Sequence, residues 1–358
     1  MRRNAVLAGV TALACGAGMV AVAAPAHAAS WRNIGSSALA YNGSNDRVDF
    51  ASKGVGWSVG AAGSFFSPQA KIVRWNGSAW VGQTSPVGFT PTDVAAASAS
   101  RAWIVGYSLG GTLGLYWNGT TWAKVAWPGG VTLPTQVAAA TDGTAYSIGG
   151  LDSSAGGISA ILRWTGTAWT DAKVPLPASS SITAVDVKAK NNVWLAGTTT
   201  SGTTVTGLVM HYNGSTWRTI KIPGSVGVPA YQAVMHRIVV NSPTNVYVLR
   251  VKQNAQVTNA LLHYNGSAWR TVNTPLNAAG IGLSSDGASG VVMLPITTGT
   301  KTQYMHYSGT AWTTLNGPAR TGTVQAGDLD HRPGTAALVS AGTASTPEKK
   351  TPFIEYFG

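Results

Sequence analysis

The fold of this chain is decided by the stretch Leu-Leu-His-Tyr-Asn-Gly-Ser-Ala-Trp at residues 261–269. Two apolar residues precede a basic and an aromatic residue, and Asn-Gly then leads through two small residues to Trp269. Asn-Gly between apolar runs is the strongest short-range signal of a β-hairpin, because a type I′ turn needs positive φ at both central residues. With a turn over residues 264–267, we expect Trp269 to pair with Leu262 and to be buried with it.

The stretch recurs along the chain, and its tryptophans lie 42 to 52 residues apart. A period in the forties with strand-like patterning is typical of β-propellers. The recurring tryptophans are Trp31, Trp80, Trp122, Trp169, Trp217, Trp269 and Trp312.

A second phrase precedes each hairpin, most clearly Val-Trp-Leu-Ala-Gly at residues 193–197. An aliphatic residue about nine positions earlier marks an innermost strand, so each repeat contains four short strands, the content of one propeller blade. These aliphatic residues are Val48, Val94, Val137, Val185, Ile238, Leu283 and Leu329.

The two ends of the chain complement each other. Residues 353–358 resemble the first half of the hairpin stretch, and residues 29–31 resemble its second half. Joined in space they would form a seventh hairpin, which closes a ring without an exposed edge strand. The sequence therefore predicts an all-β, seven-bladed β-propeller as one domain over residues 29–358.

The blade resembles the kelch-type, galactose-oxidase-like propeller repeat. Residues 145–150 match the strand that ends in a Gly pair, and Tyr212 with Trp217 resembles the paired aromatics across the next hairpin. The chain is also similar to secreted actinobacterial propellers, many of which have no assigned activity. Galactose-oxidase chemistry requires a tyrosine cross-linked to a cysteine, and the chain has no cysteine after Cys15, which excludes that activity.

Residues 1–28 are predicted to be a signal peptide. A basic start is followed by an apolar stretch and by Ala-His-Ala at residues 26–28, which predicts cleavage after Ala28 and a secreted, extracellular protein without a membrane span. The alternatives are a retained membrane anchor or lipoprotein processing at Cys15.

The charge of the chain argues against nucleic acid as a partner. Without Arg2 and Arg3 the 24 basic residues become 22, against 12 acidic ones, but they are scattered and form no run. An exported basic protein is expected to be attracted to anionic surfaces such as cell-wall polymers. The alternative is that this charge only keeps the protein soluble.

The sequence contains no recognised catalytic motif, metal motif or cofactor motif. His211, His263 and His306 share one repeat position, which indicates a structural role. The densest polar cluster is residues 328–332, which contains Asp328, Asp330 and His331; it is a candidate metal or sugar site, or simply a charged turn. His331 is expected near the entry to an inner strand.

A further candidate site lies just before the inner-strand aliphatic residues. Five of the seven residues there are polar and they differ between blades, which favours an asymmetric ligand site at one mouth of the central channel; solvent-facing strand starts are the alternative. Arg250 replaces a repeated glycine and is expected in a loop on the same face. The candidate ligand-binding residues are Arg47, Asp93, Gln136, Arg237, Arg250, Asp328, Asp330 and His331.

Together these features predict a secreted, monomeric, non-catalytic binding module without a cofactor, whose ligand is a carbohydrate or a cell-envelope polymer. One alternative is a glycan hydrolase or lyase that acts at the channel mouth through Asp93, Asp328, Asp330 or His331. A deep pocket lined by the last three would favour it. Another alternative is a scaffold for protein partners.

Overall fold

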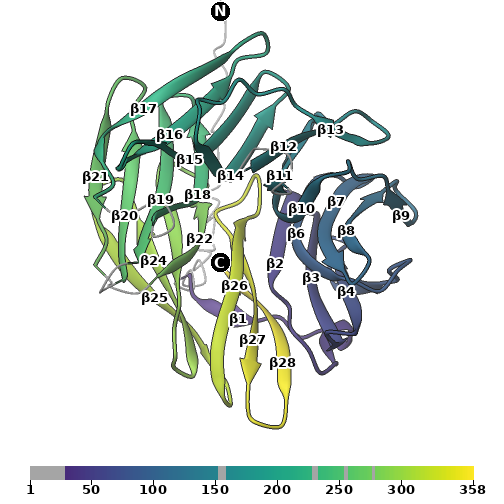
Figure 1. Cartoon of the computed structure of the whole chain (residues 1–358). Helices are drawn as coiled ribbons and strands as arrows, with labels where there is room; N and C mark the ends of the chain where they lie inside the picture. The colour runs from purple at the N-terminus through teal and green to yellow at the C-terminus, as the bar shows by residue number, and fades with distance from the viewer. Residues whose placement is uncertain (1–28, 152–158, 228–232, 254–256, 276–278) are drawn as a thin grey trace, which may run out of the picture.

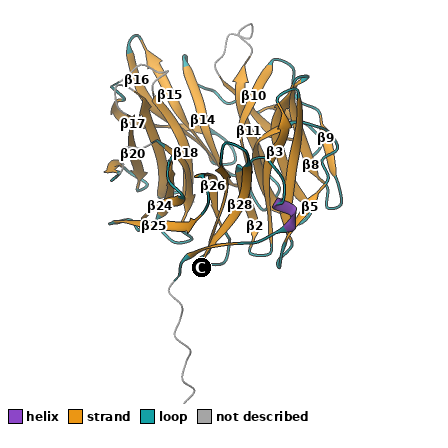
Figure 2. Cartoon of the chain, turned by 90° about the horizontal axis from the view of Figure 1, so that it is seen from below, coloured by secondary structure: helices purple, strands orange, loops and turns teal. Residues whose placement is uncertain are grey.

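The computed structural model describes residues 29–151, 159–227, 233–253, 257–275 and 279–358. Their strands form seven four-stranded antiparallel sheets around a common centre (Figure 1). The predicted seven-bladed propeller is therefore confirmed. The described helical structure is a single 3₁₀ turn, η1 (Ser37–Leu39), on the outside of the ring (Figure 2).

In every blade the chain runs from the centre outward, and the last blade takes its outer strand from the N-terminal end. The innermost strands are β2 (Arg47–Ser52), β6 (Thr90–Ser98), β10 (Val131–Ala139), β14 (Ser180–Ala189), β18 (Ala233–Ser242), β22 (Gly280–Ser285) and β26 (Thr323–His331). The second strands are β3 (Val55–Ser64), β7 (Arg101–Ser108), β11 (Ala145–Leu151), β15 (Asn192–Ser201), β19 (Asn245–Gln253), β23 (Val291–Pro295) and β27 (Leu338–Ser345). The third strands are β4 (Ser67–Trp75), β8 (Gly111–Trp117), β12 (Ser159–Trp164), β16 (Thr204–Tyr212), β20 (Val257–Tyr264), β24 (Lys301–Tyr307) and β28 (Lys350–Phe357). The outer strands are β5 (Trp80–Gln83), β9 (Trp122–Val125), β13 (Trp169–Asp171), β17 (Trp217–Ser225), β21 (Trp269–Asn273), β25 (Trp312–Ala319) and β1 (Trp31–Asn33).

The hydrophobic core lies between neighbouring blades. Trp57 on β3 is completely buried and packs against Trp117 and Trp122 of the next blade, with ring centroids 6.3 Å away in both cases. The second-strand aromatics Trp103, Trp194 and Tyr247 are buried to the same degree. Large aromatic side chains at this repeated position therefore hold the ring together, because each removes a large apolar area from water.

The Asn-Gly hairpins differ from the expected two-residue turn. Trp269 pairs with Tyr264, not with Leu262, and the loop between them has four residues. Gly266 has a positive φ of 94°, whereas Asn265 is not among the described residues with positive φ. The Asn265 side chain explains the longer loop, because its Oδ1 accepts the backbone N–H groups of Ser267 and Ala268 at 3.0 and 2.8 Å.

The glycine that ends the repeated second-strand phrase allows two strands to approach closely. A Cβ atom on Gly197 would lie 1.9 Å from the carbonyl oxygen of Ser181 on the inner strand. The inner strand bulges toward this position, with a register shift between Ile182 and Ala184. The glycine is therefore a requirement of the fold in this blade and does not indicate a ligand.

The two ends of the chain close the ring as predicted. Strand β1 pairs with β28, and Trp31 lies opposite Phe357. The indole of Trp31 stacks on Tyr304 of the preceding blade, with ring centroids 3.8 Å apart. The closing strand therefore contacts two blades at once.

Blade seven differs from its sisters by a buried carboxylate on its third strand. Glu355 is completely buried, pairs with Arg320 at 2.8 Å, and accepts hydrogen bonds from the hydroxyl groups of Thr302 and Tyr304. Since both partners of the ion pair lie between blades six and seven, they are removed from water together. In the other six blades the residue at this register position is apolar: Val73, Leu115, Leu162, Met210, Leu262 and Met305.

Among the described residues, no helix has the length and apolar character needed to cross a membrane. The predicted signal peptide, residues 1–28 with Cys15, lies outside the described residues.

Candidate functional site

The central channel between the inner strands contains two chambers. The entry chamber lies where the inner strands begin and has a volume of about 800 Å³. The exit chamber lies along their later residues and has a volume of about 360 Å³. Gln136 and Arg237 line both chambers and therefore mark the constriction between them.

The wall of the entry chamber is built from bulges in the inner strands. In β6, β14 and β18 the residue at the register shift binds a backbone carbonyl of the following blade. Thr92 donates to Pro134 at 2.6 Å, Thr183 donates to Met235 at 2.8 Å, and His236 binds the carbonyl of Ile281 at 3.0 Å. Because a carbonyl only accepts, Nε2 of His236 carries the proton in this contact.

The sequence-predicted ring of variable residues forms the constriction. Asp93 accepts the backbone N–H of Val137 at 2.9 Å, and Gln136 accepts that of Val185 at 3.3 Å. Asp328 likewise accepts the N–H of Val48 from the first blade at 3.4 Å. The ring therefore lies inside the channel, between its two chambers, and each of these side chains connects adjacent blades.

The two arginines of the ring differ in how completely they are bonded. Arg47 donates to the carbonyl oxygens of Thr92, Asp46 and Gly327, so it connects three blades. Its Nε lies 3.9 Å from Oδ1 of Asp93. Within the described residues, Arg237 donates only from Nη1, to the carbonyl of His236 at 3.1 Å. Its remaining N–H groups have no hydrogen-bond partner there and are open to a ligand in the channel, although the Asp93 and Asp328 carboxylates attract the same guanidinium.

The two chambers differ in their charged groups. Asp93 and Asp328 line the exit chamber and are absent from the lining of the entry chamber, whereas Arg47 lines only the entry chamber. Asp46 is the carboxylate of the entry chamber, and it is hydrogen-bonded to Ser44 at 2.5 Å. The ring thus presents mainly guanidinium groups on its entry side and carboxylates on its exit side.

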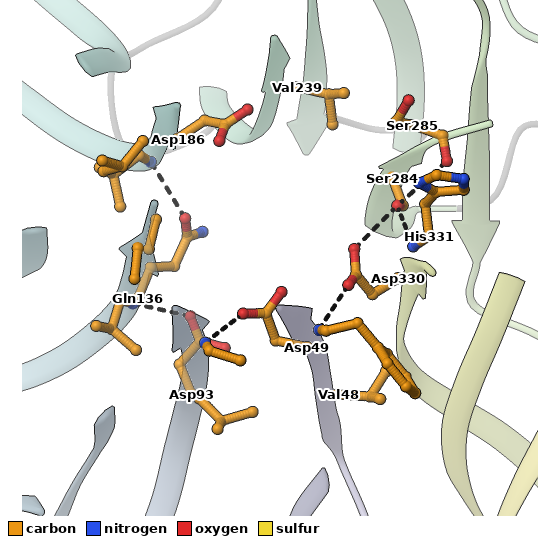
Figure 3. Close-up of a pocket in the computed structure, with 18 of the residues that line it drawn as sticks. Val48, Asp49, Asp93, Gln136, Asp186, Val239, Ser284, Ser285, Asp330 and His331 are labelled. Atoms are coloured by element: carbon orange, nitrogen blue, oxygen red, sulfur yellow. Dashed lines mark hydrogen bonds between the residues drawn. The ribbon is translucent and has the colours of Figure 1, made fainter. Parts of the chain in front are cut away.

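A second polar ring, of which the sequence predicted only Asp330, lies in the exit chamber (Figure 3). Asp49 accepts the N–H of Ala96 at 2.5 Å, and Asp186 accepts that of Val240 at 2.8 Å. Both lie two residues after a constriction position, so they point to the same side of the strand. That period of two was the available signal.

Asp330 belongs to this second ring and ties blade seven to blade one. Its Oδ2 accepts the N–H of Phe50 at 2.9 Å, and its Oδ1 lies 3.3 Å from the hydroxyl of Ser284 (Figure 3). Lys188, another residue missed from the sequence, forms an ion pair with Asp186 at 3.0 Å. The exit chamber therefore holds five aspartates, namely Asp49, Asp93, Asp186, Asp328 and Asp330.

Burial shifts the pKa values of several of these groups. Removal from water raises the pKa of Asp330 to about 7 and that of Asp93 to about 6. Burial, reinforced by the neighbouring Asp330 carboxylate, raises the pKa of Asp49 well above its usual range. Burial also lowers the pKa of His236 to about 4, so that imidazole is neutral at pH 7.

Two predicted site residues lie elsewhere than expected. His331 is the last residue of β26, not near its entry, and it lines the exit chamber with its Nε2 bound to the carbonyl of Thr335 at 2.6 Å. Arg250 lies within β19 and not in a loop, because the strand continues to Gln253 in pairing with β18 and β20. Arg250 lines neither chamber.

No group of three or more His, Cys, Asp or Glu side chains in the described part of the chain is arranged to hold a metal ion. The carboxylates of the exit chamber instead accept backbone N–H groups, as the distances above show.

The rim of the entry chamber is apolar over blades two and three. Tyr107, Pro91 and Pro134 line it together with Leu133. The side chain of Leu133 is 59% exposed, and its backbone has a positive φ of 43°. An apolar rim above polar hydrogen-bonding groups is the usual composition of a small-molecule site.

No model of a known protein family matches the chain, and no curated protein matches it in sequence. The kelch-type resemblance therefore stays a prediction, although the propeller fold is established. Solved propeller structures are similar in shape. YCF48 from Cyanidioschyzon merolae is 12% identical, with a TM-score of 0.57 over 91% of this chain and 98% of that one.

Two carbohydrate-active proteins show the same likeness. The polysaccharide lyase Uly1 is 10% identical, with a TM-score of 0.60 over 90% of this chain and 91% of that one. The six-bladed fucose lectin of Aleuria aurantia is 13% identical, with a TM-score of 0.50 over 78% of this chain and 96% of that one. At identities this low, the similarity in shape shows the propeller fold and is no evidence for a shared function.

Proposed function

We propose that the protein is exported and acts as a non-catalytic module that binds a carbohydrate or a cell-envelope polymer at the entry chamber. The observation that carries the proposal is the composition of this chamber. Tyr107 and Leu133 offer apolar surface at the rim, while Arg237 offers unused donors at the floor. Sugars have an apolar C–H face and polar edges, so this combination suits them.

The hydrogen bonds that the carboxylates already make favour binding over catalysis. Asp93, Asp328 and Asp330 each accept a backbone N–H of a neighbouring blade. Such bonds hold the inner strands together and occupy an oxygen of each candidate acid or base. Propellers of similar shape include both a fucose lectin and a polysaccharide lyase, so shape alone does not separate the two functions.

A glycan array probed with the purified protein tests the proposal. We expect binding to a defined set of glycans, with affinity reduced in Arg237→Gln and kept in Asp330→Asn, since of these two residues only Arg237 lines the entry chamber. Binding that survives Arg237→Gln but is lost in Asp330→Asn would move the site to the exit chamber. A protein that binds no glycan and no cell-wall fraction would contradict the proposal.

Export has its own test. N-terminal sequencing of protein recovered from the culture medium should begin at Ala29, after the Ala-His-Ala sequence. Recovery of a lipid-modified chain that begins at Cys15 would replace this prediction with membrane anchoring.

A second candidate function is hydrolysis or elimination of a glycan in the exit chamber. The observation that favours it is a pocket lined by Asp328, Asp330 and His331, in which the pKa of Asp330 is raised to about 7. A carboxyl group with a pKa near the working pH suits general acid–base catalysis. Release of reducing ends or unsaturated products, abolished in Asp330→Asn, would establish this function.

A further inference from the structure

Leu133 is an inserted residue at the rim of the entry chamber. In blade two, Thr90 and Pro91 are consecutive and pair with Tyr107 and Gly106. In blade three the same pairing joins Thr132 to Gly150 and Pro134 to Gly149, and Leu133 stands between them without a partner in the ladder.

This insertion places Leu133 in an unfavourable conformation and environment. Its φ of 43° lies in the left-handed region, which a branched apolar residue rarely adopts. Its side chain is 59% exposed and lines the mouth of the channel. Both features oppose folding stability, and backbone strain that persists at the mouth of a pocket is characteristic of functional positions.

The floor below this rim carries two guanidinium groups, Arg237 and Arg47, against one carboxylate, Asp46. Arg237 has N–H groups without a protein partner among the described residues, and Arg47 lies beside it in the same chamber. The ring carboxylates Asp93 and Asp328 line the opposite, exit side. An anion that approaches from the entry side therefore meets guanidinium groups before it meets these carboxylates, and guanidinium binds carboxylate and sulfate strongly.

From this arrangement we propose that the ligand of the entry chamber is an anionic saccharide. Leu133 and Tyr107 pack on the apolar face of a sugar ring, and Arg237, with Arg47 beside it, binds the carboxylate or sulfate group of that ring. This inference rests on the proposed carbohydrate-binding function and specifies its ligand class. The neutral His236 adds an imidazole to the wall without adding charge.

Calorimetric titration of the purified protein with three matched probes tests the inference. The probes are tetragalacturonate, its fully methyl-esterified form and a sulfated oligosaccharide of similar length. We expect one of the two anionic probes to bind at least tenfold more tightly than the neutral ester, with an affinity that falls as salt is raised. The stronger anionic probe identifies carboxylate or sulfate as the recognised group.

Two variants separate the roles of rim and floor. Arg237→Gln should reduce the affinity for the anionic probe to that for the ester. Leu133→Gly removes the apolar contact but relieves the left-handed strain, so affinity should fall about fivefold while the melting temperature stays the same or rises. Leu109→Gly is the matched control, because Leu109 is an exposed leucine, 62% accessible, that does not line the chamber.

The outcomes distinguish this inference from the proposed function beneath it. Equal binding of acid and ester forms, or full affinity in Leu133→Gly, overturns the anionic-saccharide inference and leaves carbohydrate binding standing. Failure of every charged and neutral glycan to bind overturns both. If Arg237→Gln does not fold, the comparison of acid with ester on the unmodified protein and the Leu133→Gly variant still decide the question.

Discussion

The entry and exit chambers belong to one channel and are lined by the same seven strands, yet their polar groups are used differently. In the exit chamber Asp49, Asp186 and Asp330 each accept a backbone N–H of the next blade. In the entry chamber Arg237 keeps unused donors, and Leu133 is strained and exposed. A polar, variable ring is therefore not by itself a binding site, because its groups can already be hydrogen-bonded within the protein.

The largest expected effect tests the structural role of the exit chamber. Asp330→Ala removes the acceptor for the N–H of Phe50 and leaves that group buried without a partner. We expect the free energy of unfolding to fall by about 2 kcal/mol, measured by denaturant titration, while glycan affinity is unchanged. Asp330→Asn keeps an acceptor and should lose much less. A fully stable Asp330→Ala protein would show that this carboxylate is free for chemistry.

The second effect is a pH dependence that arises in the exit chamber. Because burial raises the pKa of Asp330 to about 7, the folded state binds a proton that the unfolded state has already lost. Its stabilising contribution is fully present below about pH 4 and is lost progressively as pH rises from there through 7. His236, with its pKa lowered to about 4, acts in the opposite direction only below about pH 6.5.

We therefore expect the free energy of unfolding to fall by about 1 kcal/mol between pH 6.5 and 8. Asp330→Asn should weaken this dependence, while Asp49, whose pKa burial also raises, acts in the same direction. Thermal unfolding over that range measures the change. A wild-type protein whose stability rises over the same range would contradict burial of this carboxyl group.

A smaller effect of opposite sign is expected at the entry rim. Leu133→Asn places a residue that tolerates the left-handed region at φ 43°. Unfolding should become more difficult by about 0.5 kcal/mol, because strain is relieved and no core contact is lost. A loss of stability comparable to that of Asp330→Ala would mean that Leu133 is part of the core, and the contrast between the chambers would disappear.

The smallest effect concerns the exposed hairpin tip of blade one. Phe65 and Phe66 are 69% and 78% exposed, on the same face as the entry chamber but outside its lining. Replacing both by serine should change stability by less than about 0.5 kcal/mol and leave glycan affinity unchanged. If a specific protein partner binds the unmodified protein but not this variant, the scaffold hypothesis is supported and this hairpin tip is its binding surface.

Much of the fold could be predicted because its signals are repeated. The hairpin tryptophans, the inner aliphatic residues and the pairing of residues 29–31 with 353–358 all follow from local sequence copied seven times. The pairing of Trp269 was wrong because a side-chain cap from Asn265 lengthens the loop. Arg250 was misplaced because the repeated glycine was taken as the end of the second strand, whereas β19, like β3, β7 and β15, continues past that position.

The site was only partly predictable. The constriction ring was found from its variation between blades, but Asp49 and Asp186 were missed, although the two-residue period of a strand places them beside it. The separation into two chambers with different charged groups depends on which way each side chain points in the channel. The strain at Leu133 depends on a one-residue insertion whose backbone conformation cannot be read from sequence.

The closing strand has a consequence for how fast the ring can form. Trp31 and Phe357 are 326 positions apart in the chain, whereas the partners of every other hairpin are separated by a few residues. Bringing such distant ends together costs about 4 kcal/mol more loop entropy than closing a short turn. Contacts of this range also slow folding. A permuted chain would join Gly358 to Ala29 through a short linker and open at Asn265-Gly266. It would keep every strand pair, but the pair that closes the ring would lie in blade five instead of blade seven. Its folding rate would then show whether ring closure itself, or the particular blade that closes the ring, limits the rate of folding.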